Sequence, residues 1–532
     1  QLKEKIEFFE SFDFKGFIDL VIQTEDGKYH IIDWKTCSWG WDARKKADPM
    51  ITYQLTLYKH FFAQKHNIDP KNIETYFALL KRTAKNNIVE IFRVTSGAKK
   101  TENALNLINK ALYNISNGFH IKNRLACDHP LSPSGVGTQT KYMIEALLKT
   151  GRYKAYCLGG AIKHQDYRAM GVAPYGEDWV VQPVDGYGTP DMIRSVLRHH
   201  KPDLLWFMTD PRFFHWLWEI EDEIRMNIPM VYYHVWDNKP YPTFNERYYS
   251  SNDLICTISK VTDDIVRNVA PDVECIYQPH SVNTEIFKKF PEETIKEFKQ
   301  EFFKHDKFML FYNNRNARRK QTGSLIFWFK EFLDKVGHDK AQLLMHTEVN
   351  DPHGQDLRAI VDHLGLTNGE VLFSESKVPP EKLALLYNTV DVTCTISDAE
   401  GFGLSTMESL ACATPIIATM TGGLQEQVTD GENFFGVGIE PSSKAVIGSQ
   451  EIPWIYEDRI SGEDCVNAML EMYNMTKEER DRLGSLGRDH VVKNYNFNTM
   501  SDRWVEIIDD VCEKHGSWET RKNYKSWAIK EV

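Results

Sequence analysis

The stretch from residue 395 to residue 423 constrains the fold of this 532-residue chain most strongly, because loop, helix and strand signals follow one another there. Residues 400–403 form a glycine-bearing loop, residues 404–413 have the composition of a short helix, and Thr414-Pro415 breaks into an apolar run that is typical of a buried strand. This succession predicts half of an α/β unit.

Two glycines and two glutamates give this loop the chemistry of a ligand site. Gly401 and Gly403 allow the backbone to approach a ligand, and the helix start behind them offers N–H groups and a positive dipole end to an anion. Glu400 and Glu408 accept hydrogen bonds from hydroxyl groups. We therefore expect a ligand with both a phosphate and a sugar; the alternative is a helix with two solvated glutamates.

The Glu-x7-Glu spacing, with Gly-Phe-Gly after the first glutamate, resembles the donor-site signature of the retaining glycosyltransferases of family GT4. The resemblance implies an α/β protein with the GT-B fold, in which two Rossmann-like domains face a cleft, a UDP- or GDP-sugar as donor, and no cofactor. The absence of an Asp-x-Asp pair agrees with a metal-free mechanism. The resemblance assigns Glu400 to catalysis and the following residues to donor binding: Gly401, Phe402, Gly403, Leu404 and Glu408.

A basic loop supplies candidate cations. A predicted strand at residues 308–314 leads into Arg315-Asn-Ala-Arg-Arg-Lys320, and the resemblance matches Arg315 and Lys320 to the family's catalytic arginine and lysine. Arg318 and Arg319 leave this match ambiguous by a residue or two. Cations here would neutralise the diphosphate as its bond to the sugar breaks; the alternative is a basic loop without a ligand.

The other half of the GT-B unit is predicted at residues 124–285. A short strand is followed by a loop with Gly135 and Gly137 and by a helix at residues 139–148, which is the first unit of a Rossmann-like sheet. The resemblance places this loop opposite the donor, but a bare turn would look the same. Further strands are predicted at residues 180–184, 204–208, 230–233 and 254–258.

His234 follows the third of these strands, where ligands gather in open α/β sheets. The resemblance makes it a catalytic cleft histidine, with Asp237 as a second candidate; a histidine satisfied within the core is the alternative. His280 and Ser281 replace the family's usual Asn and Gly, so we transfer no ligand role to them. The nucleotide-sugar domain is expected at residues 286–495, and helices at residues 496–532 are expected to cross back to the first half.

The first 120 residues have a different character. They carry 18 Lys and Arg against 14 Asp and Glu, whereas the whole chain has a net charge of -11. A strand from Gly16, a turn at residues 25–27 and a strand from Tyr29 predict a hairpin that brings Asp19, Asp33 and Lys35 together. Two carboxylates and a lysine suit metal-assisted cleavage of a phosphodiester.

Gly-x-Ile-Asp, Ile-Ile-Asp-x-Lys-Thr and Gln54-x3-Tyr58, in this order, resemble the RecB-type branch of the PD-(D/E)XK nucleases. The resemblance implies Mg²⁺ or Mn²⁺ bound by Asp19 and Asp33, and DNA as a partner; a hairpin with surface charges is the alternative. Family members usually carry a further acidic residue on a preceding helix. Here Glu4, Glu7 and Glu10 precede the hairpin in a short segment. Truncation of the domain therefore stays an open alternative.

The leading prediction is a retaining glycosyltransferase that moves a sugar from a nucleotide sugar to an unknown acceptor hydroxyl, fused to a nuclease-like domain. The alternative is a metal-dependent DNA nuclease or DNA-modification protein whose transferase half glycosylates modified DNA bases, an arrangement that would suit a virus, although the acidic remainder of the chain argues against tight DNA binding. Because no apolar run reaches the length of a membrane span and no signal peptide opens the chain, we expect a cytoplasmic protein, in the host-cell cytoplasm if the chain is viral.

Overall fold

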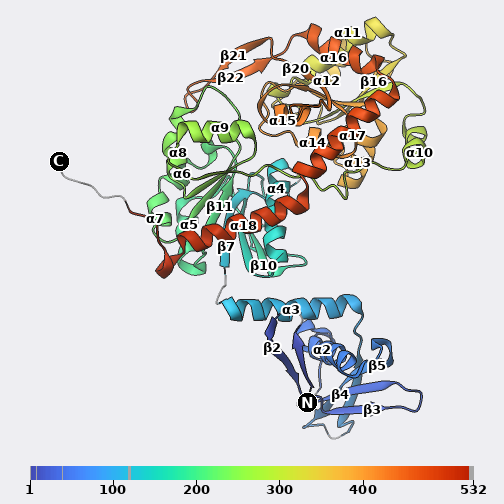
Figure 1. Ribbon diagram of the computed structural model, residues 1–532, viewed down its shortest axis with the longest axis vertical. Helices are drawn as coiled ribbons and strands as arrows, with labels where there is room; N and C mark the ends of the chain where they lie inside the picture. Colours follow the sequence, from blue (N-terminus) through green and yellow to red (C-terminus); the bar gives the residue numbers. More distant parts are fainter. Residues whose placement is uncertain are drawn as a thin grey trace, which may run out of the picture. The chain divides into compact units, whose positions relative to one another are not determined.

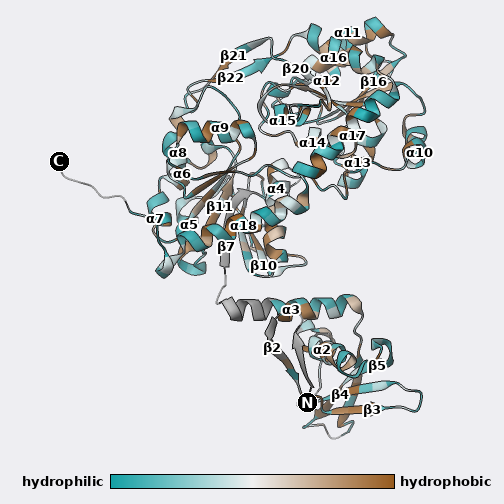
Figure 2. Ribbon diagram, viewed as in Figure 1, coloured by the Kyte–Doolittle hydropathy of each residue, from teal (hydrophilic) through white to brown (hydrophobic). Residues whose placement is uncertain are grey.

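The computed structural model describes residues 2–6, 9–38, 40–84, 86–117, 121–132 and 134–526. Contacts divide the chain into two compact units, Gln1–His120 with Lys149–Tyr153, and Ile121–Leu148 with Lys154–Val532 (Figure 1). Hydrophobic residues concentrate in the strands inside each unit, while the outer faces of helices such as α10 (Glu292–Phe302) are hydrophilic (Figure 2).

The first unit is built on a four-stranded sheet with the order β3-β4-β5-β6. The strands β3 and β4 form the predicted antiparallel hairpin, β4 and β5 are parallel, and β6 returns antiparallel to β5. A parallel pair needs a crossover, which α2 supplies. The bounds are β3 (Leu20–Gln23), β4 (Tyr29–Cys37), α1 (Ala43–Ala47), α2 (Pro49–His66), β5 (Ile73–Lys81), β6 (Val89–Val94) and α3 (Ala98–Asn117).

The strand predicted from Gly16 begins instead at Leu20, because Gly16 ends a separate hairpin of β1 (Leu2–Ile6) and β2 (Phe9–Gly16). The helix α2 packs its apolar side on the sheet, where Leu55 and Phe61 meet Ile31 and Phe77 in one buried cluster.

The second unit begins with an eight-stranded, mostly parallel sheet in the order β14-β13-β12-β11-β7-β8-β10-β9. Its strands are β7 (Ile121–Asp128), β8 (Tyr153–Gly160), β9 (Met170–Val172), β10 (Gly176–Pro183), β11 (Leu204–Met208), β12 (Met230–His234), β13 (Leu254–Thr257) and β14 (Cys275–Tyr277). The sequence predicted β7 and β10 to β13 but not β8, β9 or β14. The main covering helices are α4 (Gly135–Lys149), α5 (Pro190–His200) and α9 (Lys260–Val269).

A six-stranded parallel sheet with the order β17-β16-β15-β18-β19-β20 forms the other half of the second unit. Its strands are β15 (Phe308–Asn313), β16 (Ala341–His346), β17 (Val371–Ser374), β18 (Val392–Thr395), β19 (Ile416–Thr419) and β20 (Gly436–Ile439). The helices that pack around it include α11 (Thr322–Val336), α12 (Leu357–His363), α13 (Pro380–Thr389), α14 (Leu404–Ala411) and α16 (Gly462–Asn474). The loop, helix and strand predicted at residues 400–418 are therefore confirmed as the approach to α14, α14 itself and β19.

Side chains cap the starts of two helices in this half. The side chain of Asp356 accepts a hydrogen bond from the Ala359 N–H, so α12 begins at Leu357. The helix α17 (Lys477–Asn494) starts after a capping box of Thr476 and Glu479.

The chain returns to the first half through α18 (Phe497–His515) (Figure 1). The ring of Trp504 contacts Trp206 and Tyr233 of the first sheet, and the backbone carbonyl of Met500 accepts a hydrogen bond from Gln278. Among the helices in the part of the chain that the structure describes, none combines the length and the apolarity that a bilayer crossing requires.

Candidate functional site

A cavity of about 1510 Å³ lies between the two halves of the second unit. Its walls come from the carboxyl ends of strands in both sheets, from the amino end of α4 and from the loop ahead of α14. Carboxyl ends of parallel strands are where open α/β sheets bind ligands. The following predicted residues line it: Gly135, Arg315, Glu400, Gly401, Phe402, Gly403, Leu404 and Glu408.

The loop at residues 400–403 is held in shape by a second glycine pair, Gly422 and Gly423. A Cβ on Gly422 would lie 2.1 Å from the carbonyl oxygen of Glu400, and the Gly423 N–H donates to that oxygen at 2.9 Å. Gly403 has φ +98° and stands directly before α14, so only glycine adopts this conformation without strain. The start of α14, residues 403–405, thereby lines the cavity.

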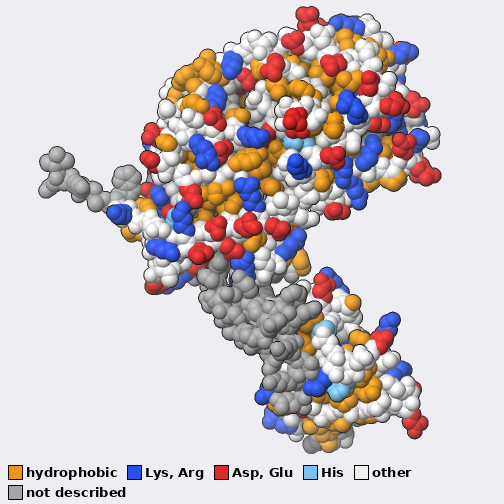
Figure 3. Space-filling view, viewed as in Figure 1, with side chains coloured by type: hydrophobic (Ala, Val, Ile, Leu, Met, Phe, Trp, Pro, Cys, Tyr) orange, Lys and Arg blue, Asp and Glu red, His pale blue; other side chains and the backbone are white. Residues whose placement is uncertain are grey.

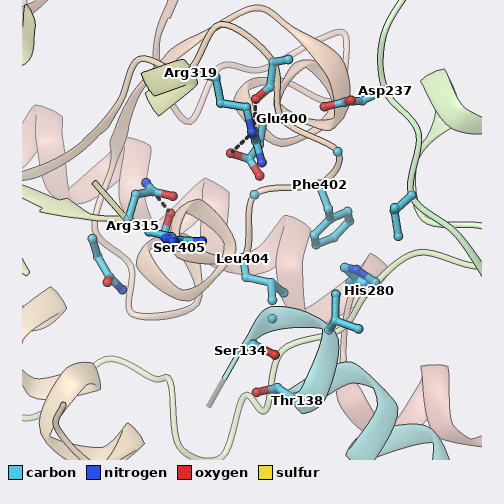
Figure 4. Close-up of a pocket in the computed structure, with 18 of the residues that line it drawn as sticks. Ser134, Thr138, Asp237, His280, Arg315, Arg319, Glu400, Phe402, Leu404 and Ser405 are labelled. Atoms are coloured by element: carbon cyan, nitrogen blue, oxygen red, sulfur yellow. Dashed lines mark hydrogen bonds and ion pairs between the residues drawn. The ribbon is translucent and has the colours of Figure 1, made fainter. Parts of the chain in front are cut away.

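Three arginines reach the cavity from the loop after β15, and each is paired. Arg315 binds Asp351, Arg318 binds Glu457 through both terminal nitrogens at 2.9 and 2.6 Å, and Arg319 donates to the Ala399 carbonyl. Figure 4 shows Arg319 beside Glu400, whose carboxylate lies 4.0 Å away. The guanidinium groups of Arg315 and Arg318 have raised pKa values, because they donate these hydrogen bonds to carboxylates.

Lys320 lies outside the cavity lining. Its side chain is 8% exposed and is ion-paired with Glu400, and burial lowers the pKa of the ammonium well below its usual value. The turn Arg318–Lys320 is a 3-10 helix, in which successive side chains point in different directions. Arg318 and Arg319 therefore face the cavity, and Lys320 supports Glu400 from behind.

Glu408 lies on α14 at the wall of the cavity. The hydroxyl of Tyr387 donates to it at 2.9 Å, and burial raises the pKa of the Glu408 carboxyl to about 7. A partly buried carboxylate with one donor has remaining acceptor capacity, which suits the hydroxyl groups of a ligand.

On the opposite wall, Ser134 and Thr138 of the α4 region face Leu404 across the cavity (Figure 4). Gly135 lies in the first turn of α4 and not in a loop ahead of it, since the helix begins four residues earlier than predicted. Gly137 does not line the cavity; a Cβ there would lie 2.5 Å from the Ser132 carbonyl oxygen, so this glycine permits close backbone packing.

His234 is in the core and does not line the cavity. It is fully buried, its Nε2 is 2.7 Å from the Tyr249 hydroxyl, and burial lowers the pKa of the imidazole to about 3. The structure thus places His234 in the core, where its Nδ1 has no hydrogen-bond partner among the described residues. Asp237, three residues later, lines the cavity, and burial raises its pKa while Arg319 and Lys320 lower it.

His280 and Ser281 line the cavity, although the sequence assigned them no role. The Nδ1 of His280 is 2.7 Å from the Tyr233 hydroxyl, its ring packs edge-on against Phe402, and burial lowers its pKa to about 3. The position of His280 and Ser281 at the crossing between the halves could have indicated that they line the cavity. They were given no role because they differ from the family's usual residues.

The first unit brings its predicted residues together on the helix side of the sheet. The Gln54 amide donates to Asp33 at 3.2 Å and to the Tyr58 hydroxyl at 3.0 Å, and the Lys35 ammonium lies 2.8 Å from Asp33. Asp19 accepts from the Trp34 N–H at 2.8 Å. Burial raises the pKa of Asp33, Lys35 lowers it, and the charge of Asp19 raises it further.

Asp19 and Asp33 fit a divalent cation in part. Two nearby carboxylates suit Mg²⁺, which is bound through one or two carboxylates plus water and phosphate oxygens. However, no group of three or more His, Cys, Asp or Glu side chains within the described ranges is arranged to hold a metal. Glu7 and the side chains of Glu4 and Glu10 lie outside the described residues.

Comparisons with known proteins match each unit to a family. Residues 293–471 match the family described as Glycosyl transferases group 1, and residues 2–129 match the PD-(D/E)XK nuclease superfamily.

Among curated proteins, the chain is 28% identical over 189 residues to D-inositol 3-phosphate glycosyltransferase 1 of Catenulispora acidiphila, covering 34% of this chain and 44% of that protein. It is 24% identical over 251 residues to a probable sucrose-phosphate synthase of Thermosipho melanesiensis, covering 46% and 53%. The chain spans about half or less of the length of these relatives.

Among solved structures, sucrose-phosphate synthase from Thermosynechococcus elongatus is similar over 74% of this chain and 100% of its own, with 16% identity and a TM-score of 0.59. The Anabaena protein HepE in complex with UDP and glucose is similar over the same shares, with 16% identity and a TM-score of 0.56. These likenesses show that the second unit has the GT-B fold. The chain therefore combines a group 1 glycosyltransferase domain of GT-B fold with an amino-terminal domain of the PD-(D/E)XK nuclease superfamily.

Proposed function

We propose that the second unit is a retaining glycosyltransferase that moves a sugar from a nucleotide sugar to an acceptor hydroxyl. One observation carries the proposal: the amides at the start of α14, Arg318, Arg319 and the carboxylates Glu400 and Glu408 converge on one cavity between two Rossmann-like halves. Cations and amides suit a diphosphate, and carboxylates suit hydroxyl groups.

Each group has a place in the proposed reaction. The acceptor oxygen bonds to the anomeric carbon on the face from which the diphosphate leaves, and the acceptor proton leaves with the diphosphate. Arg319, which has no carboxylate closer than 4.0 Å among the described residues, and the amides behind Gly403 neutralise the negative charge that grows on the leaving group. Arg318, paired with Glu457, lies in the same wall. Glu400 holds hydroxyls of the transferred sugar, and Glu408 holds those of the ribose.

We propose a UDP- or GDP-sugar as the donor. HepE, whose fold the second unit shares, has been solved in complex with UDP and glucose, which favours UDP as the first nucleotide to test. No cofactor enters the proposed transfer.

The test is a hydrolysis and transfer screen with a panel of UDP- and GDP-sugars, followed by NMR of the product's anomeric carbon. We expect one donor to be consumed and its anomeric configuration to be kept; an inverted product would contradict the mechanism. Arg319→Ala should slow turnover about 100-fold, as expected when one group that stabilises the transition-state charge is removed. Arg482→Ala, which changes an exposed arginine of α17 that does not line the cavity, is the matched control.

We also propose, as a second activity, metal-dependent cleavage of DNA by the first unit. The cluster of Asp33, Lys35, Gln54 and Tyr58 favours it, because a carboxylate and an ammonium 2.8 Å apart suit a metal and a phosphate together. Mg²⁺ or Mn²⁺, when bound by Asp19 and Asp33, would supply the activated water. Asp33→Ala should abolish cutting of linear DNA in Mg²⁺, whereas Asp26→Ala, in the turn of the same hairpin, should cut normally. Equal cutting by the two variants would contradict this activity.

A further inference from the structure

The second half of the GT-B unit reaches over to the first half through a hairpin of β21 (Ser443–Ile447) and β22 (Ile455–Arg459). This hairpin stands between β20 and α16 and forms a two-stranded sheet of its own (Figure 1). Its exposed side carries Val446 and Trp454, and apolar side chains gather there in Figure 3.

The tip of the hairpin is packed into the first half. Ile452 is buried in the hydrophobic cluster of that half, and Ile455 packs against it. Two hydrogen bonds join the halves here: the side-chain amide of Asn238 donates to the Tyr456 carbonyl at 2.9 Å, and the Tyr456 N–H donates to the Lys239 carbonyl at 2.6 Å.

The base of the hairpin is fixed to the half with the six-stranded sheet. Glu457 accepts from both Arg318 and Arg459, Arg459 also pairs with Asp398 at 2.6 Å, and the Thr421 hydroxyl donates to Asp458 at 2.7 Å. The hairpin thus holds Arg318, one of the cavity cations, while its tip rests on the other half.

The tip and two strand ends form one wall of the cavity, which we call the acceptor-side wall and define as residues 208–212, 235–238 and 447–455. Its lining includes Trp236, Ile447, Ser449, Ile452 and Ile455. An indole, aliphatic side chains and a hydroxyl suit the mixed apolar and polar surface of a polyhydroxylated molecule.

The charges of this wall are unfavourable for an anion. Arg212 is its only cation in the sequence of these three segments, against the carboxylates of Asp210, Asp237 and Glu451. Asp210 binds the Arg212 guanidinium with both oxygens, at 2.9 and 3.0 Å. These hydrogen bonds to Asp210 raise the pKa of Arg212, and the charge of Glu451 at the hairpin tip adds to the effect.

Arg212 is therefore already paired with one carboxylate, and the charge of a second, Glu451, acts on it. A phosphate on the acceptor would have to displace Asp210 from Arg212, and the charge of Glu451, an exposed residue of the hairpin tip next to the lining residue Ile452, would repel it. A neutral hydroxyl-bearing acceptor meets no such penalty, because carboxylates accept hydrogen bonds from hydroxyls.

We infer that the β21–β22 hairpin completes an acceptor subsite for a neutral polyhydroxylated acceptor, and that Glu451 and Asp210 select against acceptors that carry a phosphate. This inference rests on the proposed glycosyl transfer. The hairpin belongs to the half with the six-stranded sheet, and its tip packs on the half with the eight-stranded sheet. The choice of acceptor therefore depends on an element that joins the two halves.

The test uses the full chain, the donor selected by the nucleotide-sugar panel, and matched acceptor pairs: glucose and glucose 6-phosphate, fructose and fructose 6-phosphate, myo-inositol and its 3-phosphate. We expect transfer to the neutral member of at least one pair, with kcat/KM at least about tenfold above that of its phosphate. Glu451→Gln should narrow this ratio several-fold and Asp210→Asn should narrow it further, while Val446→Ser, on the exposed side of the hairpin, should leave it unchanged.

Preference for the phosphorylated members would overturn the inference, and so would transfer to neither member of any pair by a chain that still hydrolyses its donor. A ratio that Glu451→Gln and Asp210→Asn leave untouched would overturn the role of these two carboxylates. A chain that neither binds nor hydrolyses any nucleotide sugar would contradict the proposed function instead, so the two failures are distinguishable.

Discussion

The two candidate sites of this chain are built in different ways. The cluster around Asp33 lies on one sheet and one helix, so its members are at most 39 residues apart in sequence, from Asp19 to Tyr58. The cavity around Glu400 is lined by residues from both sheets, α4, the loop ahead of α14 and a hairpin, which range from 134 to 457. A site made from adjacent elements is readable from spacing, whereas a site between domains depends on how distant segments pack.

The first and largest expected effect tests whether the two sites act independently. Lys35→Met removes the ammonium 2.8 Å from Asp33, so DNA cutting should fall about 10²–10³-fold, the usual loss when one charge-stabilising donor is removed from an active site. Sugar transfer should be unchanged. Lys28→Met, in the turn of the same hairpin, is the control. Parallel nuclease and transfer assays check this, and loss of both activities would break the division into two sites.

Next in size is a change in the scaffold of the donor loop. Gly422→Ala would place a Cβ 2.1 Å from the Glu400 carbonyl oxygen at a φ of +50°, so the loop must shift and donor affinity should fall about 100-fold. Gly369→Ala has a φ of +82° in open space and imposes backbone strain alone. Calorimetric titration with the nucleoside diphosphate measures the affinities of the Gly422→Ala and Gly369→Ala variants. Equal affinities would mean that the second glycine pair does not shape the site.

Glu408 has a raised pKa, which predicts a pH dependence of the stability of the second unit. Its folded-state pKa is raised from 4.5 to about 7, so the protonated form is favoured in the folded protein. The stabilisation is complete below pH 4.5 and is lost as the pH rises to about 7, by about 2 kcal/mol after allowance for solvent screening.

Urea unfolding at pH 5 and pH 8 measures this loss. Glu408→Gln should reduce the difference between the free energies of unfolding at the two pH values. Glu513→Gln, at an exposed position of α18, should leave that difference unchanged. Glu426, whose pKa burial also raises to about 7, contributes with the same sign and remains in both variants. An unchanged pH dependence in Glu408→Gln would show that this carboxyl titrates near its ordinary value.

The smallest effect concerns the attachment of the hairpin. Thr421→Val removes the hydroxyl that donates to Asp458 at 2.7 Å, and one hydrogen bond contributes about 1 kcal/mol. We expect a slightly lower Tm and a weaker preference between neutral and phosphorylated acceptors. Thr499→Val, at an exposed position on α18, should leave that preference as it is. A preference unaffected by Thr421→Val would mean that the base of the hairpin need not be fixed for its tip to act.

The sequence predicted those parts of the site that local chemistry dictates. The loop before α14 was readable because glycines and a helix start identify it, and the β3–β4 hairpin because turn residues and alternation define it. Asp33 and Lys35 share a face because strand side chains alternate, and Gln54 and Tyr58 share a face because helical residues four apart are neighbours.

Only the tertiary structure decided which of several suitable side chains reach the cavity. Within Arg318–Lys320 a rotation about a tight turn exposes two arginines and buries the lysine. His234 ends its strand against Tyr249 in the core, while Asp237 lines the cavity. These outcomes depend on the packing of residues far apart in the chain, as does the hairpin that joins Glu457 to Arg318 and Ile452 to the other half. Spacing along a sequence carries the periodicity of single elements, but it does not carry the contacts between them.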